Sequence, residues 1–232
     1  MNQQPTILIS GASGNMGQAM VSKFLAEGFR VTGLVPPNDK IKMDVSDPAF
    51  TRSTVDLGNE TETAQAIQEL IQTNGRIDAA ILTVGGFAMG DIAATTGEDI
   101  TRQYQLNFLT AYHAARPLFL HMKANGKGKI FLVGSRPGMD MKNGKGMTAY
   151  ALAKSMIFRL SELLNEEARG TEVVTSVIVP STIDTPQNRA AMPDADFNQW
   201  VSPAAIAEAV YFYCTEQSAA IREPVIKLFG GS

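Results

Sequence analysis

The chain has few of the residues that build disulfide frameworks or metal sites. Its 232 residues include one cysteine, Cys214, which excludes an intrachain disulfide. The two histidines, His113 and His121, stand too far apart for one helical turn. No cysteine or carboxylate spacing supports them as metal ligands. The sequence therefore predicts no metal site.

Long apolar runs and runs of one charge are missing as well. No uninterrupted apolar segment approaches the ~20 residues that cross a bilayer, so we expect no membrane span. Lys and Arg number 20 against 23 Asp and Glu, and no basic stripe is present, which argues against a nucleic-acid partner. The first residues lack the charged and apolar regions of a signal peptide, so the expected location is cytoplasmic.

What the chain does have is an ordinary globular composition. Hydrophobic residues make up 44% and charged residues 19%, which excludes disordered, coiled-coil and collagen-like chains. The length of 232 residues is enough for one large core, and no linker or repeat divides it. We therefore expect a single domain over residues 1–232.

Short aliphatic runs alternate with amphipathic segments along the whole chain. Continuous apolar strands separated by helices are typical of a parallel sheet that is covered on both faces. The sequence predicts an α/β fold, a single Rossmann-type doubly wound sheet of about seven strands. The expected strands are residues 6–10, 30–35, 53–57, 77–84, 129–134, 172–179 and 224–229, and the expected helices are 16–27, 61–74, 97–124, 148–168 and 203–216.

A glycine-rich segment joins the first expected strand to the first expected helix. It places glycines at 11, 14 and 17, where backbone N–H groups and a helix N-terminus can meet a pyrophosphate. A tight turn without a ligand is the alternative. Asp56 closes the third strand, and Gly85 and Gly86 follow the fourth, at the same expected edge. The second strand ends without a carboxylate or an arginine, so the sequence favours neither NAD nor NADP.

Four side chains are candidates for proton chemistry. Tyr150 and Lys154 stand one helical turn apart, and a nearby ammonium favours a phenolate and lowers the phenol pKa. Ser135 follows the fifth strand, where its hydroxyl can polarise a carbonyl oxygen or merely cap a turn. Asn107 lies inside an expected helix, where asparagine is mildly unfavourable, so it is either functional or simply exposed.

Taken in order, these segments resemble the short-chain dehydrogenase/reductase family over essentially the whole chain. The resemblance implies that Tyr150 donates or accepts the proton, that Lys154 lowers its pKa and holds the nicotinamide ribose, and that Ser135 positions the substrate oxygen. It implies that Asn107 holds a proton-relaying water. Asn15 occupies the place of the family's usual middle glycine. The cofactor contacts that it implies, besides Tyr150 and Lys154, are Gly11, Ser13, Asn15, Met16, Gly17, Asp56, Leu57, Val84, Gly85, Gly86, Pro180, Ile183 and Thr185.

One stretch is similar to the quinonoid dihydropteridine reductase branch of that family. Residues 184–189, continuing to Phe197 and Trp200, carry this similarity, and we expect a substrate loop at about residues 185–200. Ser135 departs from that branch, which typically lacks a catalytic serine. The first hypothesis is therefore hydride transfer between NAD(P)(H) and a carbonyl or alcohol. The alternatives are quinonoid dihydropteridine reduction and a non-catalytic NAD(P)-binding regulator.

The partners that follow are a small carbonyl, quinone or pterin-like substrate and further copies of the chain. The family implies a homodimer or homotetramer built on the long helices that contain Asn107 and Tyr150. The apolar run at residues 156–158 fits such an interface and a buried core equally well.

Overall fold

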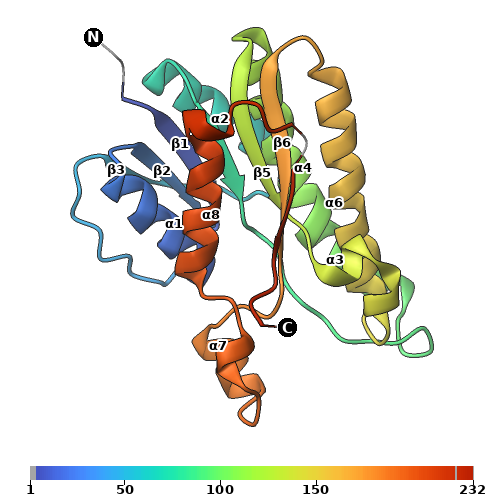
Figure 1. The fold of residues 1–232 in the computed structure, drawn as a ribbon. Helices are drawn as coiled ribbons and strands as arrows, with labels where there is room; N and C mark the ends of the chain where they lie inside the picture. The colour runs from blue at the N-terminus through green and yellow to red at the C-terminus, as the bar shows by residue number, and fades with distance from the viewer. Residues whose placement is uncertain (1–3, 223, 232) are drawn as a thin grey trace.

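Seven parallel strands form one sheet in the order β3-β2-β1-β4-β5-β6-β7 (Figure 1). The computed structural model describes residues 4–222 and 224–231. The order reverses between β1 and β4, and in such sheets ligands bind beyond the carboxyl ends of the strands at the reversal. The strands are β1 (Thr6–Ser10), β2 (Arg30–Val35), β3 (Phe50–Thr54), β4 (Ala79–Leu82), β5 (Lys127–Val133), β6 (Glu172–Pro180) and β7 (Val225–Leu228).

Helices cover both faces of the sheet, as the alternating pattern predicts (Figure 1). Helices α1 and α8 pack on one face through Phe24 and Val210, and α2, α4 and α6 pack on the other through Ile67, Leu118 and Ile157. The helices are α1 (Asn15–Ala26), α2 (Glu60–Asn74), α3 (Gly97–Tyr104), α4 (Thr110–Ala124), α5 (Arg136–Met139), α6 (Thr148–Glu167), α7 (Pro186–Ala191) and α8 (Pro203–Cys214).

Two expected elements differ in the structure. The third strand is Phe50–Thr54 rather than 53–57, and it pairs with β2. Its residues are mostly polar and half-buried or exposed, so the strand has no continuous apolar run that would identify it in the sequence. The expected helix 97–124 is divided by a π-helical turn, Gln105–Leu109, between α3 and α4. Such turns insert one residue into a helix and are frequent at functional sites.

Two segments outside the expected strands and helices, residues 139–147 and 185–200, contain short helices of their own. Residues 139–147 include the end of α5 and a 3₁₀ turn at Met141–Gly144, and residues 185–200 hold α7 and a 3₁₀ turn at Phe197–Gln199. Figure 1 shows α7 projecting beyond the carboxyl edge of the sheet. Within the described residues, no helix combines the length and apolar character needed to cross a membrane.

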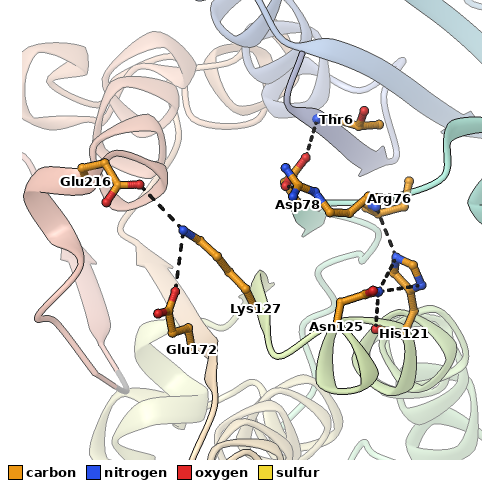
Figure 2. Close-up of polar contacts among 9 residues, drawn as sticks. Thr6, Arg76, Asp78, His121, Asn125, Lys127, Glu172 and Glu216 are labelled. Atoms are coloured by element: carbon orange, nitrogen blue, oxygen red, sulfur yellow. Dashed lines mark hydrogen bonds and ion pairs between the residues drawn. The ribbon is translucent and has the colours of Figure 1, made fainter. Parts of the chain in front are cut away.

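Charged and polar side chains tie down the amino ends of the strands, at the edge opposite α7 (Figure 2). Asp78 accepts a hydrogen bond from the Thr6 N–H at 2.8 Å and pairs with Arg76. Lys127, at the start of β5, pairs with Glu172 and Glu216 at 3.6 and 3.7 Å. These contacts fasten the edge of the sheet that lies away from the expected ligand site.

His121, which lies at the same edge of the sheet, should make the stability of the fold depend on pH. Its Nε2 accepts a hydrogen bond from the Ile77 N–H at 3.3 Å, and burial lowers its pKa below 6.5 although Asp78 opposes the shift. The unfolded chain therefore takes up this proton first, so stability should fall as pH drops below about 6.5. We expect the Tm of wild type to decrease between pH 7 and 5.5. His121→Gln, which keeps an acceptor, should show a flatter profile, and identical profiles would contradict this expectation.

Candidate active site

The segment between β1 and α1 forms a cradle that only small residues can build. Gly11 has a φ of 63°, and a Cβ there would come 2.7 Å from Thr83 Oγ1. The Gly14 N–H donates to the Gly11 carbonyl oxygen at 3.0 Å. A Cβ on Gly17 would collide with that same oxygen. Close packing of helix against strand therefore requires the absence of side chains here.

The N-terminus of α1 faces the edge where the strand order reverses. Gly14 is its N-cap, and in the described part of the chain no side chain caps its first turn. Its first N–H groups belong to Asn15, Met16 and Gly17 and point out of the helix, as anion binding requires. Ser13 is buried beside them. The Asn15 amide donates to Gln187 Oε1 of α7 at 2.8 Å, so α7 lies against the mouth of the cradle.

Replacing Gly17 with alanine tests this cradle. The added Cβ meets backbone atoms of Gly11 and Ala12, which cannot move aside as a side chain can. We expect Gly17→Ala to destabilise the fold by about 1–3 kcal/mol in urea unfolding and to weaken NAD(P)H binding. Gly97→Ala is the matched control, since no described atom lies within 4 Å of its added Cβ. Equal stability of the two variants would refute the expected close packing.

The half-buried Tyr150 phenol and the buried Lys154 ammonium stand one turn apart on α6. Lys154 is 4% exposed, and its Nζ donates to the Val133 carbonyl oxygen at 2.8 Å. Burial lowers the pKa of Lys154 to about 8. Tyr150 contacts the ring of Phe87 edge-on, with 5.1 Å between the ring centroids. Phe87 is itself 61% exposed, so one side of the Tyr150 ring is covered by a solvent-exposed aromatic side chain.

The electrostatics of Tyr150 differ from the sequence-based prediction. Burial raises the pKa of Tyr150 above 10.0, and a hydrogen bond with the Ser135 side chain opposes the rise. The net shift is therefore opposite to the lowering that the sequence predicts, and Lys154 is not among its causes. Its ammonium is directed to the Val133 carbonyl, and desolvation of the phenol dominates. The raised pKa keeps the phenol protonated at neutral pH.

Ser135 is a cap, one of the two interpretations that its sequence position left open, and its action on a carbonyl oxygen stays a prediction. Its Oγ accepts a hydrogen bond from the Gly138 N–H at 3.1 Å, so it caps α5, and it also acts on the Tyr150 phenol. Gly138 packs against the backbone of Lys154, where a Cβ would come within 2.6 Å of its carbonyl carbon. The short helix α5 thus brings the serine to the turn of α6 that carries the tyrosine.

Asn107 lies at the centre of the π-helical turn and is fully buried. Its Oδ1 accepts from the Gly86 N–H at 3.0 Å, and its Nδ2 donates to the Gly86 carbonyl oxygen at 2.9 Å. A Cβ on Gly85 would come 2.6 Å from Asn107 Oδ1 and 3.0 Å from Lys154 Nζ. The missing side chain at Gly85 therefore lets the amide and the ammonium approach one point.

The other expected cofactor contacts follow the ends of three strands. Asp56 is exposed, and its carboxylate accepts from the Gly58 N–H at 2.9 Å. After β6, Ile183 forms a bridge with Val201, and the Thr185 side chain caps α7. Leu57 is buried beyond β3, Val84 is half-buried beyond β4, and Pro180 is the last residue of β6.

The end of β2 offers no free acid for an adenosine ribose among the residues described. Pro36 and Pro37 follow the strand, and the Asp39 N–H donates to the Pro36 carbonyl oxygen at 3.0 Å. The Asp39 carboxylate pairs with Arg52 of β3 at 2.9 Å. The nearest acid is thus already engaged by a cation, in keeping with the lack of a cofactor preference in the sequence.

Comparison with known proteins decides the family. The sequence profile described as "short chain dehydrogenase" matches residues 5–196, most of the chain. The chain belongs to the short-chain dehydrogenase family. The seven-stranded sheet and the order of the motifs agree with this membership, and the chain is an NAD(P)-dependent oxidoreductase.

This dehydrogenase is similar in sequence to two reductases. Acetoacetyl-CoA reductase of Acinetobacter sp. (strain RA3849) is 24% identical, and the match covers 100% of this chain and 98% of that protein. Dihydropteridine reductase of Dictyostelium discoideum is 25% identical over 92% of this chain and 89% of that protein. The similarity to the dihydropteridine reductase branch therefore has a counterpart among these relatives.

Two solved structures resemble the fold of this dehydrogenase over nearly its whole length. An oxidoreductase of the short chain dehydrogenase/reductase family from Burkholderia thailandensis has a TM-score of 0.85 and 27% identity, covering 98% of this chain and 92% of that one. ElxO with NADP bound has a TM-score of 0.89 at 18% identity and covers 98% of both chains. These likenesses confirm the predicted Rossmann-type fold.

Proposed function

We propose that this dehydrogenase transfers hydride between a nicotinamide and the carbonyl or alcohol carbon of a small substrate, with Tyr150 as the general acid or base. The observation that carries the proposal is the half-buried Tyr150 phenol beside the Ser135 hydroxyl, one helical turn from the buried Lys154 ammonium. An ordinary phenol, with a pKa of about 10, carries its proton at neutral pH, and burial raises the pKa of Tyr150 further, so the proton that a reduced carbonyl requires is present.

The residues at the reversal of strand order fit a dinucleotide. The Gly11 and Gly17 backbone and the N-terminus of α1 suit the pyrophosphate, and the space at Gly85 suits the nicotinamide ribose beside Lys154. When bound, the nicotinamide supplies or accepts the hydride. The other proposed contacts are Ser13, Asn15, Met16, Asp56, Leu57, Val84, Gly86, Pro180, Ile183 and Thr185.

The remaining side chains position the substrate oxygen and its proton. Ser135 orients the oxygen towards the Tyr150 hydroxyl, which donates the proton. Lys154, whose pKa is about 8, exchanges a proton near neutral pH and is placed to resupply the phenol through a water held at Asn107. Each step uses groups that the structure gathers around Gly85 and the start of α6.

The test is NADH and NADPH oxidation by the purified protein with a panel of ketones and quinones. We expect turnover of at least one carbonyl compound, and Ser135→Ala should lower it because the oxygen loses its hydrogen-bond donor. Lys142→Met changes an exposed cation on the neighbouring segment and should leave turnover intact. Carbonyl reduction that is unaffected by loss of the serine hydroxyl would contradict the assigned role.

Quinonoid dihydropteridine reduction is the second candidate. The Dictyostelium discoideum relative and the segment of residues 184–200 favour it. Side-chain contacts connect the two ends of that segment, since Arg189 pairs with Asp184 and its guanidinium lies over Phe197, 4.6 Å from the ring centroid. Turnover of quinonoid dihydropterin that survives Ser135→Ala, without turnover of any ketone, would favour this candidate. Cofactor binding without turnover of either class would favour a regulator.

We also propose that the chain assembles into a homodimer or homotetramer through α4 and α6. Leu120 and Leu163 are 55% and 62% exposed on these helices. In the run that sequence left undecided, Ile157 and Phe158 belong to the core, and Met156 is exposed. Light scattering of wild type and of Leu163→Glu should show a larger particle for wild type, and a monomeric wild type would contradict assembly.

A further inference from the structure

Gln103 is a buried polar residue that the proposed mechanism does not use. It lies on α3, one turn before Asn107, and is 5% exposed, whereas most of that short helix faces solvent. Buried amides are costly unless they are hydrogen-bonded. Nothing in the sequence singles out Gln103, because one glutamine in a polar helix is typical of a surface position.

The contact that Gln103 makes is to the Asn107 carboxamide. Its Oε1 accepts a hydrogen bond from Asn107 Nδ2 at 2.8 Å, and its carbonyl oxygen lies 3.3 Å from the same nitrogen. An asparagine amide has two protons to donate. The Gly86 carbonyl oxygen takes one of them at 2.9 Å, and Gln103 takes the other. Gln103 therefore completes the set of partners that fixes the plane of the amide.

The position of the Asn107 amide determines the position of residues 85–86, which border the proposed nicotinamide site. Asn107 binds both the N–H and the carbonyl oxygen of Gly86, so a shift of the amide moves the loop at residues 85–86. Gly85 lies beside both Asn107 Oδ1 and Lys154 Nζ. A change at Gln103 would thus reach the loop beside the Lys154 ammonium through a single side chain, that of Asn107.

We propose that Gln103 is a positioning residue, which holds the Asn107 carboxamide so that the loop at Gly85 and Gly86 and the Lys154 ammonium keep their reactive arrangement. This inference rests on the proposed carbonyl reduction. Gln103 acts through Asn107 and touches no reacting atom. Its contribution should appear in kcat, because displacement of a catalytic group by about 1 Å can cost about 10²-fold.

Three variants separate positioning from mere packing. Gln103→Met removes the acceptor, and the adjoining cavity of about 210 Å³ gives its thioether room. Gln103→Glu keeps an oxygen for Asn107 Nδ2. Gln105→Met changes an exposed glutamine in the neighbouring turn and is the control. We measure kcat and KM for the best carbonyl substrate, NAD(P)H affinity by fluorescence titration, and Tm.

The expected result is a roughly 10- to 100-fold lower kcat for Gln103→Met, with the carbonyl KM within about twofold of wild type. NAD(P)H binding should weaken, Gln103→Glu should recover most of kcat, and Gln105→Met should match wild type. Equal kcat for Gln103→Met and wild type would overturn the inference and leave carbonyl reduction standing. Equal losses in Gln103→Met and Gln103→Glu would also overturn it. A wild type that reduces no carbonyl would overturn the proposed function together with this inference.

Discussion

Replacing Tyr150 with phenylalanine should lower kcat for carbonyl reduction by about 10³-fold, the usual contribution of a well-placed general acid. The substitution removes only the hydroxyl, which the structure places behind the Phe87 ring and near Ser135. The ring itself stays, so the packing at the start of α6 should persist. Initial rates with saturating NAD(P)H measure the effect.

Two controls make that loss interpretable. NAD(P)H affinity and Tm of Tyr150→Phe should stay close to wild type, because no backbone contact changes. Tyr213→Phe on α8 removes a phenol hydroxyl from outside the proposed site and should keep full activity. If Tyr150→Phe retained wild-type turnover, proton transfer by this residue would be disproved.

Replacing Lys154 with methionine should abolish most activity and yet make the protein more stable at pH 7. The ammonium is buried and donates to the Val133 carbonyl oxygen, and among the described residues no carboxylate lies at salt-bridge distance. Its pKa falls from 10.5 to about 8. That difference in pKa corresponds to a destabilisation of the folded wild type by roughly 3 kcal/mol. The variant loses the hydrogen bond to Val133, which offsets part of its gain in stability.

The pH dependence gives this prediction a second test. Below about pH 8 the lysine is protonated in both states, so the folded wild type bears the whole cost. Between about 8 and 10.5 the folded protein releases the proton before the unfolded chain does, so wild-type stability should rise relative to the variant. Urea unfolding at pH 7 and pH 10 measures the difference. Lys145→Met removes an exposed ammonium and should shift neither value. A Lys154→Met variant that is less stable at pH 7 would contradict the account.

The fold followed closely from the sequence because its signals are local. The expected strand at residues 172–179 is buried from Val173 to Val179, and β6 occupies nearly the same span. The third strand was misplaced because Arg52 and Thr51 are exposed at an edge, where burial does not impose an apolar pattern. The π-helical turn was missed because its cause is the tertiary contact of Asn107 with Gly86.

For the candidate site, residue types and order were informative, whereas the electrostatics were not. Sequence spacing brings Tyr150 and Lys154 onto one helix face, but it does not reveal that the ammonium bonds to Val133. Burial then raises the pKa of Tyr150, the reverse of the expected direction. Gln103 and Gln187 were not selected from the sequence, because only the folded structure shows that their side chains bond to the motif residues Asn107 and Asn15.

The central claim is direct hydride transfer to a carbonyl carbon, and isotope transfer tests it most directly. NADPH or NADH carrying two deuterium atoms at nicotinamide C4 is incubated with the enzyme and its best carbonyl substrate, and the alcohol is analysed by mass spectrometry. The account predicts one deuterium on the former carbonyl carbon, formed at a far lower rate by Tyr150→Phe. An alcohol without deuterium at that carbon, or label transfer at the wild-type rate in Tyr150→Phe, would contradict it.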